Sequence, residues 1–228
     1  TAAFRPVALK GATFSADYRN TFTRLESRNV LAALPGASRP DETILYAAHW
    51  DAYGIGPADA SGATIRPGAV DDAVGVAGVI ETARAFKAGP PPARTILFAA
   101  WTAEERGLLG SEYFAQKNAG SLAKMVANYT YDVLQTAGPA RDVVLVGAGQ
   151  NELEVGLAAV AARHGRTVTA DPKPERALFY RADHFSVAKR GVPTLLFMGM
   201  SGGADLVTGG RAAGEAWACP ASGKCLKM

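Results

Sequence analysis

Three apolar stretches of strand length in this chain are each followed closely by side chains that can bind a metal ion. Parallel strands bring their carboxyl ends to one edge of a sheet, and functional crevices in open α/β sheets lie outside that edge. The sequence therefore predicts a sheet that gathers these side chains in one site. The stretches and the residues that follow them are 43–48 with His49 and Asp51, 94–100 with Glu104 and Glu105, and 125–131 with Asp132.

A fourth acidic element lies between the first two stretches. Asp71 and Asp72 follow Gly68 and open a segment, residues 73–87, whose apolar residues recur at helical spacing. Each element also has an ordinary structural interpretation: Asp71 can cap this helix, residues 102–105 fit a capping box, and a lone histidine is more often structural than a ligand. The four elements in this order favour a metal site over those interpretations.

The chain resembles the M28 family of zinc peptidases from about residue 29 to about residue 214. The family's marks are a His-x-Asp pair, a Gly-x-x-Asp-Asp segment, a Glu-Glu pair after a strand and a later Asp, and each has a counterpart above. The resemblance implies an α/β fold, a three-layer α/β/α sandwich with a mixed, mostly parallel central sheet. It also implies a co-catalytic zinc site that removes N-terminal residues from peptides.

The resemblance assigns the metal ligands. Asp71 would bridge two zinc ions, and His49 and Asp132 would complete the first site. Glu105 would bind the second ion. The mixture of nitrogen and oxygen ligands suits zinc, with manganese and cobalt as alternatives.

The resemblance also assigns the residues beside the metal. Glu104 would take a proton from the attacking water and return it to the leaving amine, as a general base and acid. Asp51 would accept a hydrogen bond from the free nitrogen of the His49 imidazole and so fix its tautomer. Asp72 would position Asp71 through its backbone.

Residues 179–190 resemble the family's segment of aromatic, Arg, small, Asp and His residues before a last strand, here at residues 191–197. The resemblance implies that Arg181 lines the substrate pocket, while Asp183 and His184 support the site without binding metal. A helix N-cap at Asp183 is an equally good interpretation of that residue.

The family pattern ends with a further metal-binding histidine after the last strand, and this sequence has no counterpart to it. We therefore expect a weak or empty second zinc site and reduced or absent peptidase activity. His184 or a tail thiolate, from Cys219 or Cys225, is an alternative ligand. The other interpretation is that the natural C-terminus is lost or altered in this form.

Length and composition limit the class of protein. The chain has 228 residues, 48% of them hydrophobic and 20% charged, which predicts a single globular domain over residues 1–228. A formal net charge of +3 predicts no nucleic-acid partner. No apolar run approaches the roughly 20 residues of a membrane-spanning helix. Cys219 and Cys225 are the only cysteines and can form one small loop in the tail.

Partners and location follow from the resemblance alone. It implies peptide substrates with a free N-terminus and a secreted or periplasmic location, and it leaves the oligomeric state open.

The remaining elements come from hydrophobic periodicity. The pattern predicts N-terminal edge strands within residues 1–28 from the alternation of residues 13–25, and an atypical tail at residues 215–228. It further predicts a strand at 28–34, a loop at 53–67, a helix at 108–117, a strand at 143–146 and a helix at 151–164.

Two other functions remain open. A glutaminyl-cyclase-like enzyme would use a single zinc ion, so counting bound metal separates it from a co-catalytic peptidase. A degenerate peptidase fold would bind peptides without cleaving them, and an amino-acid anilide assay with added zinc would reveal that.

Overall fold

The computed structural model describes residues 10–59, 61–199 and 202–218. The strands are β1 (Val30–Leu34), β2 (Arg39–His49), β3 (Gly54–Ile55), β4 (Ile65–Arg66), β5 (Arg94–Trp101), β6 (Met125–Asp132), β7 (Asp142–Val146), β8 (Thr167–Ala170) and β9 (Thr194–Met198). The helices are α1 (Val74–Ala88), α2 (Leu109–Lys117), α3 (Leu153–Arg163), α4 (His184–Ala188) and α5 (Gly210–Ala218). Among the described residues, no helix has the length and apolar character that a membrane span requires.

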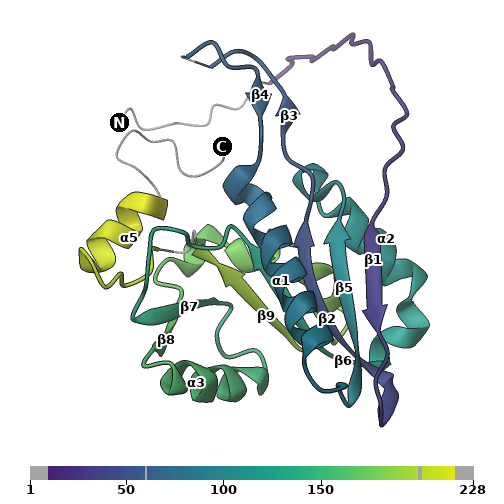
Figure 1. Cartoon of the computed structure of the whole chain (residues 1–228). Helices are drawn as coiled ribbons and strands as arrows, with labels where there is room; N and C mark the ends of the chain where they lie inside the picture. Colours follow the sequence, from purple (N-terminus) through teal and green to yellow (C-terminus); the bar gives the residue numbers. More distant parts are fainter. Residues whose placement is uncertain (1–9, 60, 200–201, 219–228) are drawn as a thin grey trace.

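A seven-stranded sheet in the order β1-β5-β2-β6-β9-β7-β8 forms the middle layer, with helices on both faces (Figure 1). Neighbouring strands pair in parallel from β5 through β2 and β6 to β9, and again between β7 and β8. Within the described part of this sheet, β1 pairs antiparallel with β5, and β7 pairs antiparallel with β9. The predicted α/β/α sandwich with a mixed, mostly parallel sheet is confirmed.

Alternation along β2 explains why both faces of the sheet are covered. Leu45 and Ala47 are buried in a cluster with residues of α2 and α4, whereas Ile44 and Tyr46 pack with residues of α1. Successive strand residues point to opposite faces, so an uninterrupted apolar run requires a helix layer on each. This packing sets the register in which β2, β5 and β6 end at the same edge.

Most predicted elements are present with shifted ends. The strands predicted at 28–34, 43–48, 94–100, 125–131, 143–146 and 191–197 correspond to β1, β2, β5, β6, β7 and β9, and the helices predicted at 73–87, 108–117 and 151–164 correspond to α1, α2 and α3. The sequence interpretation missed β8 and α5. The predicted loop at residues 53–67 contains the small ribbon of β3 and β4.

The prediction of N-terminal edge strands within residues 1–28 is wrong for the part of that segment that the structure describes. Residues 12–29 contain no strand, and the first strand begins at Val30. The large apolar side chains of this segment are between 76% and 92% exposed. Alternation produces a strand only where a neighbouring strand supplies hydrogen bonds and a buried face, and here no described strand pairs with the outer edge of β1. These side chains are Phe14, Tyr18, Phe22 and Leu25.

Candidate metal centre

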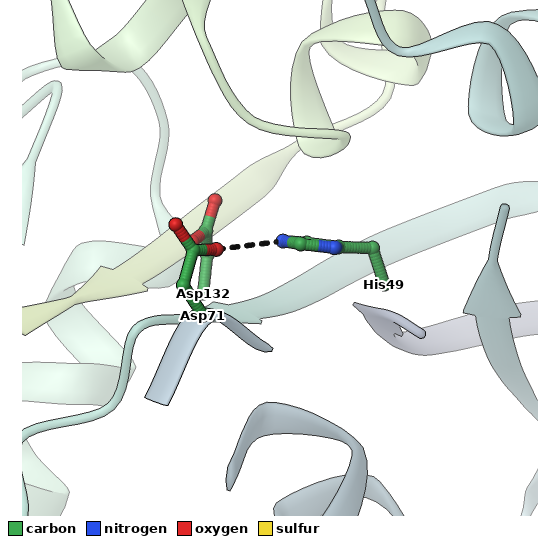
Figure 2. A group of neighbouring side chains, drawn as sticks. All are labelled: His49, Asp71 and Asp132. Atoms are coloured by element: carbon green, nitrogen blue, oxygen red, sulfur yellow. Dashed lines mark hydrogen bonds and ion pairs between the residues drawn. The ribbon is translucent and has the colours of Figure 1, made fainter. Parts of the chain in front are cut away.

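The ends of β2 and β6 and the turn before α1 bring three ligand-type side chains together (Figure 2). One ligand atom each from His49, Asp71 and Asp132 lie within 4.8 Å of one another, and His49 Nε2 is 3.1 Å from Asp71 Oδ1. Because β2 and β6 pair in parallel, His49 and Asp132 end neighbouring strands at the same edge. These are the three residues predicted for the first zinc site. Their metal-binding role stays a prediction.

The Asp72 side chain connects the three chain segments that carry this group. It is 1% exposed, and its carboxylate accepts hydrogen bonds from the backbone amides of His49 at 3.2 Å, Gly75 at 3.2 Å and Val133 at 3.1 Å. Asp72 therefore connects the end of β2, the start of α1 and the end of β6. The sequence interpretation gave Asp72 only a backbone role. The sequence feature that relates to this role is Gly75, because a side chain at that position would collide with the Asp72 carboxylate: an added Cβ would lie 2.3 Å from Asp72 Oδ1.

Asp51 acts differently from the prediction. The acceptor for His49 Nδ1 is the Asp51 backbone carbonyl at 3.0 Å, and the nearest Asp51 carboxylate oxygen is 3.6 Å away, too far for a direct hydrogen bond. The carboxylate instead accepts the backbone amides of Glu104 at 3.0 Å and Glu105 at 3.3 Å. Asp51 thus orients the imidazole through its backbone and holds the two glutamates through its side chain.

Glu104 and Glu105 begin a single helical turn, Glu104–Arg106, after β5. Glu104 is 9% exposed. Burial, with a contribution from the charge of Asp183, raises the pKa of Glu104 to about 8. Glu105 lies outside the group of three ligand atoms. Burial and a hydrogen bond to Glu105 raise the pKa of Tyr53, so this tyrosine is a neighbour of the site that the sequence interpretation missed.

Electrostatics favour a cation at the group of three. Burial raises the pKa of Asp72 to about 7, and burial with the nearby Asp72 charge raises the pKa of Asp132 well above its usual range. Burial would lower the pKa of His49, but Asp51 and Asp71 outweigh it and raise that pKa to about 12. Clustered buried carboxylates are costly unless a cation balances them. The imidazole and carboxylate donors fit zinc.

A second ion fits less well. Among the residues that the structure describes, no second group of three ligand atoms is found beside His49, Asp71 and Asp132. Asp71 and Glu105 would have to hold that ion alone. Cys219 and Cys225, the proposed thiolate substitutes, lie outside the described residues, and so does their proposed bond.

His184 does not supply the missing ligand in this arrangement. Its side chain is fully buried, with the ring edge-on to Phe179 at 4.7 Å between centroids, and burial lowers its pKa to about 3. Asp183 is also buried, and it lies at the N-cap position of α4, where its side chain makes no capping hydrogen bond. The N-cap interpretation is therefore right about the position and wrong about the hydrogen bond. Burial raises the pKa of Asp183 to about 7.

A hollow of about 570 Å³ opens beside the two glutamates. Arg181, predicted to line the substrate pocket, lies in its wall. The residues that line it are Tyr53, Glu104, Glu105, Gly107, Leu108, Glu112, Tyr180, Arg181, Phe185, Ser186 and Lys189. The hollow is therefore continuous with the predicted catalytic residue.

The comparison with known families agrees with this geometry. Residues 29–217 match the sequence model of Peptidase family M28. The chain belongs to this family. It is 46% identical over 100 residues to a "Probable zinc metalloprotease" of Pyrenophora teres f. teres, an alignment that covers 42% of this chain and 21% of that protein. The chain thus aligns with only about a fifth of this curated relative.

Two solved structures have a similar fold. BSAP, a zinc aminopeptidase from Bacillus subtilis, gives a TM-score of 0.58 at 21% identity, covering 75% of this M28 chain and 39% of BSAP. A glutaminyl cyclase from an Acidobacteriales bacterium gives a TM-score of 0.55 at 21% identity, covering 81% of this chain and 64% of the cyclase.

Proposed function

We propose that this M28 domain is a zinc-dependent peptide hydrolase of the aminopeptidase type. One observation carries the proposal: three ligand atoms from His49, Asp71 and Asp132 lie within 4.8 Å of one another. These residues would hold a tightly bound zinc ion, and Asp71 with Glu105 would hold a second ion weakly. Family membership and the zinc peptidase names of similar proteins support this function.

The residues around the metal have complementary tasks. Zinc bound there would polarise the substrate carbonyl and lower the pKa of water. Glu104, with its raised pKa, is suited to take a proton from the attacking water and return it to the leaving amine. Asp51 holds the Glu104 backbone in place by the hydrogen bond to its amide. Arg181, in the wall of the same hollow, would contact the substrate.

The proposed substrates are peptides with a free N-terminus. A secreted or periplasmic location is part of the proposal and rests on family resemblance alone. Cell fractionation with an antibody to the native protein would test the location.

A Glu104→Gln substitution tests the catalytic assignment. The zinc-loaded wild-type protein should cleave a panel of amino-acid anilides, slowly if the second ion is weakly held. Glu104→Gln should keep its zinc and lose about 10²- to 10⁴-fold in kcat, because an amide cannot accept the proton. Glu81→Gln, which removes an exposed carboxylate on α1, is the matched control. Equal turnover by Glu104→Gln and Glu81→Gln would contradict the role.

A glutaminyl-cyclase-like activity is the second candidate, favoured by the similar cyclase fold and by the single group of three ligand atoms among the described residues. Peptides with N-terminal glutamine separate the two functions. A pyroglutamyl product would identify cyclisation, and a released N-terminal residue would identify hydrolysis. Zinc binding with neither product would favour a non-catalytic peptide-binding domain.

A further inference from the structure

The turn that carries Glu104 and Glu105, between β5 and α2, has a backbone conformation that needs support. Ala103 and Leu108 have φ angles of 55° and 61°, in the left-handed region that residues with a Cβ rarely adopt. Such conformations persist where surrounding contacts hold them, and they cluster at functional sites. The Asp51 carboxylate supports one side of this turn through the amides of both glutamates. Contacts on the other side come from the chain just before β1.

Asn29 binds both ends of the turn through one side chain. Its Oδ1 accepts a hydrogen bond from the Thr102 amide at 3.1 Å, and its Nδ2 donates to the Gly110 carbonyl at 2.9 Å. Thr102 directly follows β5, and Gly110 lies in the first turn of α2. The Gly110 amide also donates to the Thr102 carbonyl at 3.0 Å. Asn29 therefore fixes the two ends of the turn to each other and to the start of β1.

The chemistry and the packing at this point fit an asparagine. A side-chain amide carries both an acceptor and donors, so it continues the pairing of β1 with β5 beyond Val30 and Ala100. At Gly110 an added Cβ would lie 2.4 Å from Asn29 Oδ1 and 2.3 Å from the Thr102 carbonyl oxygen. Only a glycine allows this close approach, so α2 begins in direct contact with the asparagine.

The residues beside Asn29 fix its own position. Ser27 Oγ lies 2.5 Å from Thr102 Oγ1, and Trp50 Nε1 donates to the Arg28 carbonyl at 3.1 Å. Trp50 directly follows β2, which ends in His49. Residues 27–29 are thus attached to the ends of β5 and β2, at the edge of the sheet where the candidate metal centre lies.

We propose that Asn29 is a positioning residue that holds Glu104 where it can exchange a proton with the attacking water. The inference rests on the proposed peptidase function, because Asn29 acts on the reaction only through Glu104. Without the amide, the Thr102 amide and the Gly110 carbonyl lose their partner, and the turn between them is released. The three proposed zinc ligands lie on other elements and keep their places.

Kinetics with the amino-acid anilides test this role. Zinc-loaded Asn29→Ala should lose about 10- to 100-fold in kcat, because a shift of about 1 Å in a catalytic group can cost that much. KM should change by less than about twofold, since Asn29 lies outside the hollow. Asn118→Ala, which removes an amide that donates to the Phe114 carbonyl near the other end of α2, is the matched control. A loss of bound zinc, or a kcat equal to that of the control, would overturn the inference.

A double substitution shows whether the effect passes through Glu104. In the Glu104→Gln protein, Asn29→Ala should lower kcat by less than about twofold, because the group that it positions is already lost. Equal losses in the two backgrounds would overturn the inference. Asn29→Asp keeps the acceptor for the Thr102 amide and loses the donor to the Gly110 carbonyl. It should show the same dependence on Glu104, and it serves where Asn29→Ala does not fold.

Hydrogen exchange tests the contact without turnover. The amides of Leu108, Leu109 and Gly110 donate to carbonyls within the turn. In zinc-loaded Asn29→Ala they should exchange at least about tenfold faster than in the wild type, as measured by mass spectrometry, while exchange in α1 stays the same. Unchanged exchange within residues 102–110, or equal acceleration in Asn118→Ala, would overturn the inference.

The two kinds of measurement separate this inference from the proposed function. Faster exchange in Asn29→Ala, with no anilide cleavage by the zinc-loaded wild type, would support the contact and contradict the peptidase. Cleavage by the wild type with an equal kcat in Asn29→Ala would support the peptidase and contradict the positioning role.

Discussion

The two halves of the candidate metal centre are built in different ways. In one half, His49 and Asp132 end neighbouring parallel strands and meet Asp71 from the turn before α1. In the other half, Glu105 lies in a turn after β5, and within residues 202–218 the acidic side chains are Asp205 and Glu215. Asp205 pairs with Arg141, outside the group of three. A sheet ladder positions ligands at strand ends, whereas a ligand from a later segment depends on how that segment packs.

The largest expected effect concerns the group of His49, Asp71 and Asp132, called the closed half from here on. Asp132→Ala or His49→Ala should lower zinc affinity by more than about 100-fold, because loss of a supporting neighbour alone typically costs 10- to 100-fold and these residues are the proposed ligands. Zinc content after dialysis, measured by elemental analysis, checks this. Asp41→Ala, which removes an exposed carboxylate on β2, is the control. Full zinc retention in either ligand variant would contradict the assignment.

The next largest expected effect is on stability, and it comes from the hydrogen bonds of the Asp72 carboxylate. Asp72→Ala would leave three buried backbone amides without their acceptor, so we expect a loss of about 2 kcal/mol in the free energy of unfolding of the zinc-loaded protein. Urea unfolding checks this, with Asp72→Asn as the variant that keeps one acceptor and loses less. A stability equal to that of the wild type would show that the connection between β2, α1 and β6 does not depend on this carboxylate.

A smaller change in zinc affinity is expected at the open half, which is the side of the site where Glu105 lies. Calorimetric zinc titration should show one tight site per chain, and Glu105→Gln should change the affinity of that site by less than about fivefold, since Glu105 lies outside the group of three. Two tight sites per chain with full peptidase activity would show that a ligand exists outside the three residues. A large loss of tight zinc binding in Glu105→Gln would show that Glu105 and the group of three bind the same ion.

The smallest effect concerns the segment after β9. Arg211 Nη2 of α5 lies 2.6 Å from the buried Asp142 carboxylate of β7. Burial would raise the pKa of Asp142, but hydrogen bonds from the Asp205 amide, Arg211 and Thr169 outweigh it and lower that pKa. This stabilisation is present above the ordinary pKa of about 4 and is lost as the pH falls below it.

Arg211→Gln should therefore lower the free energy of unfolding by about 1 kcal/mol at neutral pH and by less at low pH. Urea unfolding of both proteins at about pH 7 and about pH 3 checks the difference. A difference that is equal at both pH values would mean that the ion pair is not its cause.

Much of the fold and of the closed half could be predicted from the sequence. Apolar runs of strand length that end in His49 and Asp132, with Asp71 opening a helix, contain both the periodicity and the ligand types that such a site needs. Periodicity reports local backbone conformation and burial, and those properties place strand ends at one edge of a parallel sheet.

Only the tertiary structure decided how the site is supported. The Asp51 carboxylate binds amides 53 and 54 residues away, and Asp72 binds an amide 61 residues away. No local pattern specifies such partners, because they depend on strand register and on how the turns pack. The same reason explains why the strand prediction failed within residues 12–29, where an alternating pattern has no described strand to pair with.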